Sequence, residues 1–132
     1  MLEVSAGIVI SDSRVLCFRK GISKYPYLSH KYEFPGGKIE NGESPEEALI
    51  REFREELSAE ISSQDIQPLG LFTYSYPDFS VNLHAFVINT NDFRFILSEH
   101  ESCIWSSAEK LDQFDWAAAD RDIVKSLKQV LK

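Results

Sequence analysis

The chain has 132 residues and 43% hydrophobic content, which fits one ordinary globular domain over residues 1–132 and excludes a disordered chain. Its formal net charge is −7, so it lacks the basic balance of nucleic-acid-binding proteins, and we expect no nucleic-acid partner. An acidic protein can still bind a polyphosphate when divalent cations mediate the contact.

Two features of the sequence bear on the cellular location of the protein: its cysteine content and its N-terminal residues. Cys17 and Cys103 are too few for a disulfide framework and fit no zinc pattern, so we expect two reduced thiols. Residues 1–10 include no basic leader, and no apolar stretch approaches the length of a membrane span. These features predict a soluble cytoplasmic protein with no membrane partner.

The first third of the chain is predicted to be extended. Residues 4–11 and 14–19 read as two strands, and the turn residues Ser-Asp-Ser between them predict a hairpin. A polar loop is expected over about 20–31. Residues 32–34 form a short extended piece that stops at a Pro-Gly-Gly sequence.

The clearest helix is predicted from residue 44 to about residue 58. Ser44 can cap it, Pro45 suits the first helical position, and Glu47 completes a capping box with Ser44. Apolar residues recur at helical spacing and predict a buried stripe made of Leu49, Ile50, Phe53 and Leu57.

The second half of the chain mixes strands with one more helix. Strands are predicted at 69–75 and 81–88 around a turn at 76–78, followed by a short strand at 102–105. A final helix is expected over 120–131. This mixed order predicts a sheet covered by helices.

Three carboxylates occupy one face of the first predicted helix. Glu52, Glu55 and Glu56 are spaced i, i+3 and i+4, and like charges at these spacings weaken a helix. Magnesium, which prefers oxygen ligands, would give the cluster a purpose. The alternative is an ordinary solvated acidic face in which Glu47 and Arg51 form an i, i+4 pair. The glycine-rich loop before the helix favours a metal–phosphate site.

Residues 37–57, GKIENGESPEEALIREFREEL, resemble the Nudix box. The matching positions have its fixed spacing and are Gly37, Glu43, Arg51, Glu52, Phe53, Glu55 and Glu56. Ser58 and Ala59 stand where the family usually has glycine and an aliphatic residue. A serine in the left-handed turn that ends the helix would cost roughly 1 kcal/mol.

The resemblance implies an α/β Nudix fold, a mixed β-sheet sandwiched between α-helices, and a catalytic Mg²⁺ for which Mn²⁺ can substitute. Four metal-binding groups are implied by the match: the backbone carbonyl of Gly36 and the side chains of Glu52, Glu55 and Glu56. Arg51 would orient the glutamates, while Glu43, with Gly37, would support the loop and helix.

The resemblance extends over nearly the whole chain to the MutT-type group. Glu99 is similar in position to a further carboxylate of that group and is expected to bind metal or to act as the general base, with Glu101 as the competing candidate. Asp120 falls where the group reads the nucleotide base. The alternative for Asp120 is a plain N-cap of the last helix.

Further candidates concern the base and the phosphates. Phe34 and Tyr76 are candidate walls for the base, although buried core aromatics are an equally ordinary interpretation. Arg19, or its neighbour Lys20, is a candidate phosphate contact. The three histidines have no metal-ligand spacing and are read as structural or surface residues: His30, His84 and His100.

The sequence therefore predicts a magnesium-dependent hydrolase that converts a nucleoside triphosphate to the monophosphate and pyrophosphate. An oxidised or cytosine-containing substrate such as 8-oxo-dGTP, CTP or dCTP is implied, with cleansing of the nucleotide pool as the role and a monomer or homodimer as the assembly. Two alternatives stay open: a Nudix reaction on ADP-ribose or a dinucleoside polyphosphate, and a binding module without catalysis.

Overall fold

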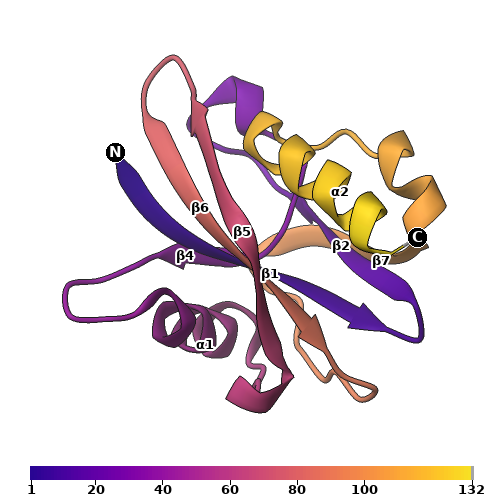
Figure 1. Ribbon diagram of the computed structural model, residues 1–132. Coiled ribbons are helices and arrows are strands. Elements are labelled where there is room, and N and C mark those ends of the chain that lie inside the picture. Colours follow the sequence, from indigo (N-terminus) through magenta and orange to yellow (C-terminus); the bar gives the residue numbers. More distant parts are fainter. Residues whose placement is uncertain (132) are drawn as a thin grey trace.

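The computed structural model describes residues 1–131, in which a mixed seven-stranded sheet separates two helices (Figure 1). The main path of the sheet is β3-β2-β1-β6-β5, with β4 paired to β1 and β7 paired to β2. The strands are β1 (Leu2–Ser11), β2 (Arg14–Lys20), β3 (Tyr32–Glu33), β4 (Gly36–Lys38), β5 (Ile66–Ser75), β6 (Ser80–Asn89) and β7 (His100–Ser107).

The predicted hairpin between the first two strands is confirmed. Asp12 and Ser13 both have left-handed backbone angles, with φ of 50° and 63°, as a two-residue hairpin turn of the primed type requires. β1 then pairs in parallel with β6, and the remaining pairs are antiparallel. The strand β1 therefore lies at the centre of the sheet.

Strand β4 was not predicted, because the Pro-Gly-Gly sequence reads as the end of an extended piece. Gly36 and Gly37 instead pair with Ala6 and Ser5 of β1. A Cβ atom added at Gly36 would lie 1.8 Å from the backbone oxygen of Ser5. Glycine is therefore what allows the loop backbone to approach β1 closely enough to pair.

Helix α1 (Pro45–Leu57) confirms the predicted helix and its capping box. The hydroxyl of Ser44 accepts from the backbone N–H of Glu47, and the Glu47 carboxylate accepts from the N–H of Ser44. Ser58 ends the helix in the left-handed conformation, with φ of 50° and ψ of 35°. The serine thus adopts the turn in which the family usually has glycine.

Helix α2 (Ala118–Val130) begins two residues before the predicted start, and this corrects one interpretation of Asp120. The N-cap is Ala117, and Asp120 lies inside the first turn, where its carboxylate caps nothing on its own helix. Three short 3₁₀ helices were also not predicted, since each is too brief to show a period: η1 (Pro26–Leu28), η2 (Ser63–Asp65) and η3 (Ala108–Gln113).

The core has two parts, one on each face of the sheet. On one face, Leu49, Phe53 and Leu57 of α1 are buried together with Val9 and Phe18 of the sheet. On the other face, α2 packs through Ile123, Val124 and Leu127. The expected arrangement of a mixed sheet between helices is confirmed (Figure 1). No helix in the described part of the chain is long and apolar enough to cross a membrane.

Candidate active site

Arg51 lies at the centre of the charged face of α1. Its guanidinium binds Glu43 through two nitrogens, at 2.7 and 3.0 Å, and donates to the backbone oxygen of Lys38 at 2.9 Å. The remaining nitrogen donates to Glu52 at 2.9 Å and to Glu55 at 3.2 Å. One arginine therefore fixes the preceding loop and two of the three clustered carboxylates at once.

Glu43 joins the glycine-rich loop to this arginine. Its carboxylate also accepts from the backbone N–H of Glu40 at 2.9 Å. The hydrogen bonds from Arg51, and then the one from Glu40, hold the pKa of Glu43 below its usual range. The i, i+4 pair considered between Glu47 and Arg51 is not formed, because the Glu47 carboxylate caps the helix instead. The acidic face is thus an organised network rather than a set of solvated charges.

The glycine-rich loop lies directly against one of these carboxylates. A Cβ atom added at Gly37 would lie 2.3 Å from the Cδ atom of Glu52. The backbone at Gly37 therefore packs directly against the Glu52 carboxylate, and a larger residue there would displace it.

The segment before β7 brings a fourth carboxylate to the same place. The N–H of Ile96 donates to the backbone oxygen of Leu57 at 2.7 Å, and the hydroxyl of Ser98 donates to the backbone oxygen of Glu56 at 3.1 Å. These contacts attach the segment to the end of α1. A pocket of about 280 Å³ results, lined by Lys20, Gly21, Ile22, Glu33, Glu56, Glu99 and His100.

Glu56 has the most perturbed side chain in this acidic pocket. Burial raises its pKa to about 8, with further contributions from a hydrogen bond to Glu52 and from the negative charges of Glu52, Glu33 and Glu99. Packing several carboxylates around a partly buried one is unfavourable without positive charge. A divalent cation would relieve this repulsion, and oxygen-only ligands suit magnesium or manganese.

The carboxylates are not yet arranged as a finished metal site. Within residues 1–131, no three side chains of His, Cys, Asp or Glu form a group ready to hold a metal ion. Arg51 holds Glu52 and Glu55, and the Glu55 side chain is 59% exposed. The chemistry of the donor set fits a hard cation, since the negative charges of Glu52, Glu33 and Glu99 all raise the pKa of Glu56.

The sequence left two choices open, between Glu99 and Glu101 and between Arg19 and Lys20, and the two members of each pair have different surroundings in the structure. Glu99 lines the acidic pocket, whereas Glu101 binds His30 at 2.6 Å and lies 3.6 Å from Arg19. Lys20 lines the pocket as well, while Arg19 donates to the backbone oxygen of His30. The pocket therefore contains Glu99 and Lys20, and the contacts of Arg19 and Glu101 are with each other and with His30.

Glu33 and His100 also line this pocket, and neither was named as a site candidate from the sequence. The buried His100 donates through Nε2 to the Glu33 carboxylate at 3.0 Å, and Lys20 lies 4.0 Å from the same carboxylate. The negative charge of Glu33 also raises the pKa values of both Glu56 and Asp120. Its position next to the Pro-Gly-Gly loop was the one available signal, and pairing of β3 with β2 then places it beside Lys20.

Asp120 lies at the other end of this group, at the start of α2. Its carboxylate accepts from the backbone N–H of Phe34 at 2.9 Å, and the residue is only 6% exposed. Burial, followed by the charge of Glu33, raises its pKa to about 8. The Phe34 ring stacks on Trp116 in the core, at a centroid distance of 4.7 Å. The Tyr76 hydroxyl accepts from the N–H of Ala119.

The perturbed pKa of Asp120 gives a stability prediction. Between its ordinary value of 3.8 and the folded value of about 8, Asp120 is ionised only in the unfolded chain. The metal-free protein should therefore lose stability as pH rises across this interval. Asp120→Asn should reduce the loss, because the amide does not titrate and its oxygen still accepts from Phe34, while the similar contribution of Glu56 remains. Thermal melts with a chelator at pH 4 to 9 measure both slopes, and equal slopes would refute the assignment.

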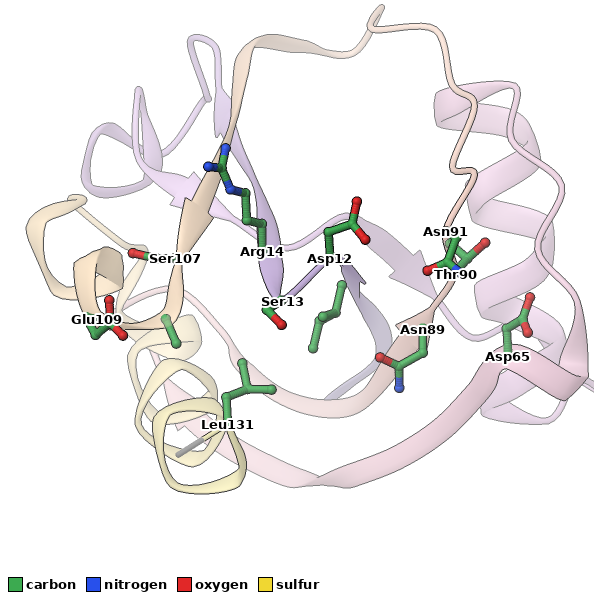
Figure 2. Close-up of a pocket in the computed structure, with 12 residues that line it drawn as sticks. Asp12, Ser13, Arg14, Asp65, Asn89, Thr90, Asn91, Ser107, Glu109 and Leu131 are labelled. Carbon is green, nitrogen blue, oxygen red and sulfur yellow. The ribbon is translucent and has the colours of Figure 1, made fainter.

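A larger cavity lies elsewhere and includes none of the residues predicted for the site. It has a volume of about 810 Å³ and lies beside the β1–β2 turn, between Asp12 and Asn89 on one side and Leu131 on the other (Figure 2). The acidic pocket is smaller, but it contains Glu56, whose pKa is raised by burial and by neighbouring carboxylates. Chemistry rather than cavity size therefore defines the candidate site.

A sheet between two helices, with a glycine-rich loop leading into an acidic helix, is the arrangement that the comparisons with known proteins also identify. The chain belongs to the NUDIX family, since the sequence model of the NUDIX domain matches residues 1–127. Its members are Nudix hydrolases, which generally use divalent metal cations.

Individual relatives cover almost the whole chain. The 8-oxo-dGTP diphosphatase of Escherichia coli (strain K12) is 27% identical over 129 residues, which is 98% of this chain and 98% of that protein. The CTP pyrophosphohydrolase of the same strain is 31% identical over 139 residues, covering 96% of this chain and 90% of that protein. A solution structure of the E. coli ORF135 protein has a TM-score of 0.81 at 29% identity, covering 98% and 90%.

Proposed function

We propose that this protein hydrolyses a (deoxy)nucleoside triphosphate to the monophosphate and pyrophosphate, using Mg²⁺ or Mn²⁺. The observation behind the proposal is the acidic pocket, which Glu56 lines together with Glu33 and Glu99, and the neighbouring Glu52, against which the backbone at Gly37 packs. Relatives that span nearly the full chain are named for activity on 8-oxo-dGTP and CTP. Removal of such nucleotides from the pool is the role that follows.

The metal would be held by carboxylates from the helix face and from the segment before β7, which are Glu52, Glu55, Glu56 and Glu99. The backbone carbonyl of Gly36 would join them. When bound, it supplies charge neutralisation for the phosphates and an activated water. Arg51 keeps Glu52 and Glu55 oriented through its hydrogen bonds of 2.9 and 3.2 Å. Hydrolysis at phosphorus needs such positioning and charge compensation more than covalent assistance.

Lys20 is the stronger candidate for a phosphate contact. It lies in the acidic pocket, whereas Arg19 is engaged with the His30 oxygen at 3.0 Å and with Glu101 at 3.6 Å. A lysine provides a compact positive charge with three donors, which suits the oxygens of a triphosphate.

Asp120 is the proposed reader of the base. With its pKa raised to about 8, it is mainly protonated at neutral pH and can both accept and donate a hydrogen bond. A protonated carboxyl can donate a hydrogen bond to an acceptor on the base edge, which an ionised carboxylate cannot do. The perturbation thus favours substrates whose edge offers an acceptor as well as a donor.

The experiment that tests the function is pyrophosphate release with magnesium across a substrate panel. The panel holds dCTP, CTP, 5-methyl-dCTP, dGTP, 8-oxo-dGTP, ADP-ribose and a diadenosine polyphosphate. A clear preference for one triphosphate supports the proposal. Faster turnover of ADP-ribose than of every triphosphate would select another Nudix reaction, and nucleotide binding without any turnover would indicate a binding module.

Replacement of Asp120 by Asn is expected to change the ranking of bases in this panel more than the rate on the best one. The amide keeps the size of the side chain but has fixed donor and acceptor atoms. The ratios of kcat/KM between bases measure the effect. An unchanged ranking would reduce Asp120 to its structural hydrogen bond with Phe34.

A further inference from the structure

Helix α2 begins without a side-chain cap of its own. The N-cap, Ala117, has no side-chain acceptor, although the first N–H groups of a helix need partners. The hydroxyl of Tyr76, from the turn between β5 and β6, accepts from the N–H of Ala119 at 2.9 Å. A tyrosine far away in sequence therefore replaces the missing cap.

The Tyr76 ring is held in place from several sides. Its own N–H donates to the backbone oxygen of Phe79 at 2.7 Å, which closes the turn. The ring of Tyr27 stacks on it at 5.4 Å with an interplanar angle of 17°, and Tyr74 and Phe79 lie at 4.7 and 5.1 Å. Tyr27 in turn donates to the Asp78 carboxylate at 2.6 Å. The hydroxyl of Tyr76 is therefore a well-fixed acceptor.

Asp120 follows directly after the residue that Tyr76 holds. Its side chain is tied separately, by the N–H of Phe34 at 2.9 Å. The start of α2 is thus anchored at three points: the N–H of Ala117 donates to the backbone oxygen of Tyr32 at 2.8 Å, the N–H of Ala119 donates to Tyr76, and Asp120 accepts from Phe34. Because the Tyr76 bond is on the residue next to Asp120, losing it should let Asp120 shift relative to Phe34 while Ala117 keeps its bond to Tyr32.

We propose that Tyr76 is a positioning residue for base selection, and that its hydroxyl sets the location of the Asp120 carboxyl through the Ala119 N–H. This inference depends on the proposed function, since it assumes that Asp120 reads the base. It assigns to the hydroxyl of Tyr76 a task separate from that of the ring. The ring can border the base, whereas the hydroxyl fixes the residue that contacts it.

Tyr76→Phe is the decisive variant, because phenylalanine keeps the aromatic contacts and removes only the hydroxyl. We expect KM for the preferred triphosphate to rise by about fivefold, the factor that one net hydrogen bond represents. The differences in kcat/KM between bases should become smaller. The value of kcat should stay within about twofold of the wild type, because the phosphate chemistry takes place in the acidic pocket. Tyr74→Phe is the matched control, since it removes the hydroxyl of a neighbouring ring and, within the described residues, that hydroxyl makes no hydrogen bond to α2.

Amide hydrogen exchange in the ligand-free protein gives a second readout. Tyr76→Phe should speed exchange at Ala119, which loses its partner, and also at Phe34, whose N–H bonds to Asp120. Faster exchange at Ala119 alone would mean that Tyr76 merely caps the helix, and this would overturn the inference.

Base reading by Asp120 and positioning by Tyr76 can be tested separately. If Asp120→Asn changes the ranking of bases and Tyr76→Phe does not, base reading stands and the positioning role is refuted. If the wild-type protein hydrolyses no triphosphate, the proposed function fails, and base selection by Tyr76 fails with it. Exchange at Phe34 then decides only whether Tyr76 positions Asp120.

Discussion

Glu52→Gln is expected to lower turnover of the best triphosphate by at least about 100-fold, the scale on which loss of a catalytic electrostatic group acts. Glu52 contacts Arg51 at 2.9 Å, helps to raise the pKa of Glu56 and lies against Gly37. The neutral amide keeps the shape of the side chain but cannot supply the charge that a cation needs. Steady-state kinetics at saturating magnesium measure the loss.

The fold should survive this change, because the carboxylates of the pocket repel one another when no cation is present. Thermal melting of the metal-free variant should therefore match or exceed that of the wild type. Glu60→Gln is the matched control, since Glu60 is a glutamate near the same helix whose partner is the exposed Arg54. A Glu52→Gln enzyme with near wild-type turnover would remove Glu52 from the catalytic site.

Gly36→Ala is expected to give the largest loss of stability. The new Cβ would lie 1.8 Å from the backbone oxygen of Ser5, so β4 and β1 could not keep their pairing. Overpacking against a backbone that cannot yield costs about 3 kcal/mol or more, which lowers the melting temperature of a domain of this size by about 10 °C. Gly21→Ala is the control, because open space surrounds Gly21. Equal melting temperatures for the two variants would contradict this account.

The neighbouring substitution, Gly37→Ala, should behave differently. Its Cβ would collide with the end of the Glu52 side chain, 2.3 Å away, and not with backbone. A flexible side chain can move aside, so the protein should fold while its activity falls with the displaced carboxylate. Comparing melting temperature and turnover for the two alanine variants separates the glycine that permits the fold from the glycine that shapes the site.

The sequence by itself determined the elements whose signals are local. Helix α1 was predicted almost to the residue, because the capping box of Ser44 and Glu47 and the apolar stripe both lie within one segment. The clustering of Glu52, Glu55 and Glu56 follows from helical spacing in the same way. The first hairpin was also predictable, since a two-residue turn is specified by the residues at the turn and on either side of it.

Other features had no local signal strong enough to read. Strand β4 depends on the close approach of Gly36 to β1, and the first turn of α2 has its Ala119 N–H bonded to Tyr76. In both cases a partner distant in sequence takes part in a hydrogen bond that no local pattern announces. Reading Asp120 as an N-cap was wrong for this reason, since a carboxylate near a helix start looks the same whether it caps the helix or faces Phe34.

Only the tertiary structure decided how the site is assembled. Glu99 reaches Glu56 because the segment before β7 bonds to the end of α1, and Glu33 joins them because β3 pairs with β2. The raised pKa values of Glu56 and Asp120 arise from burial among charges that are scattered along the chain. Spacing along a helix fixes which side chains share a face, whereas desolvation and charge–charge distances exist only once the chain has folded.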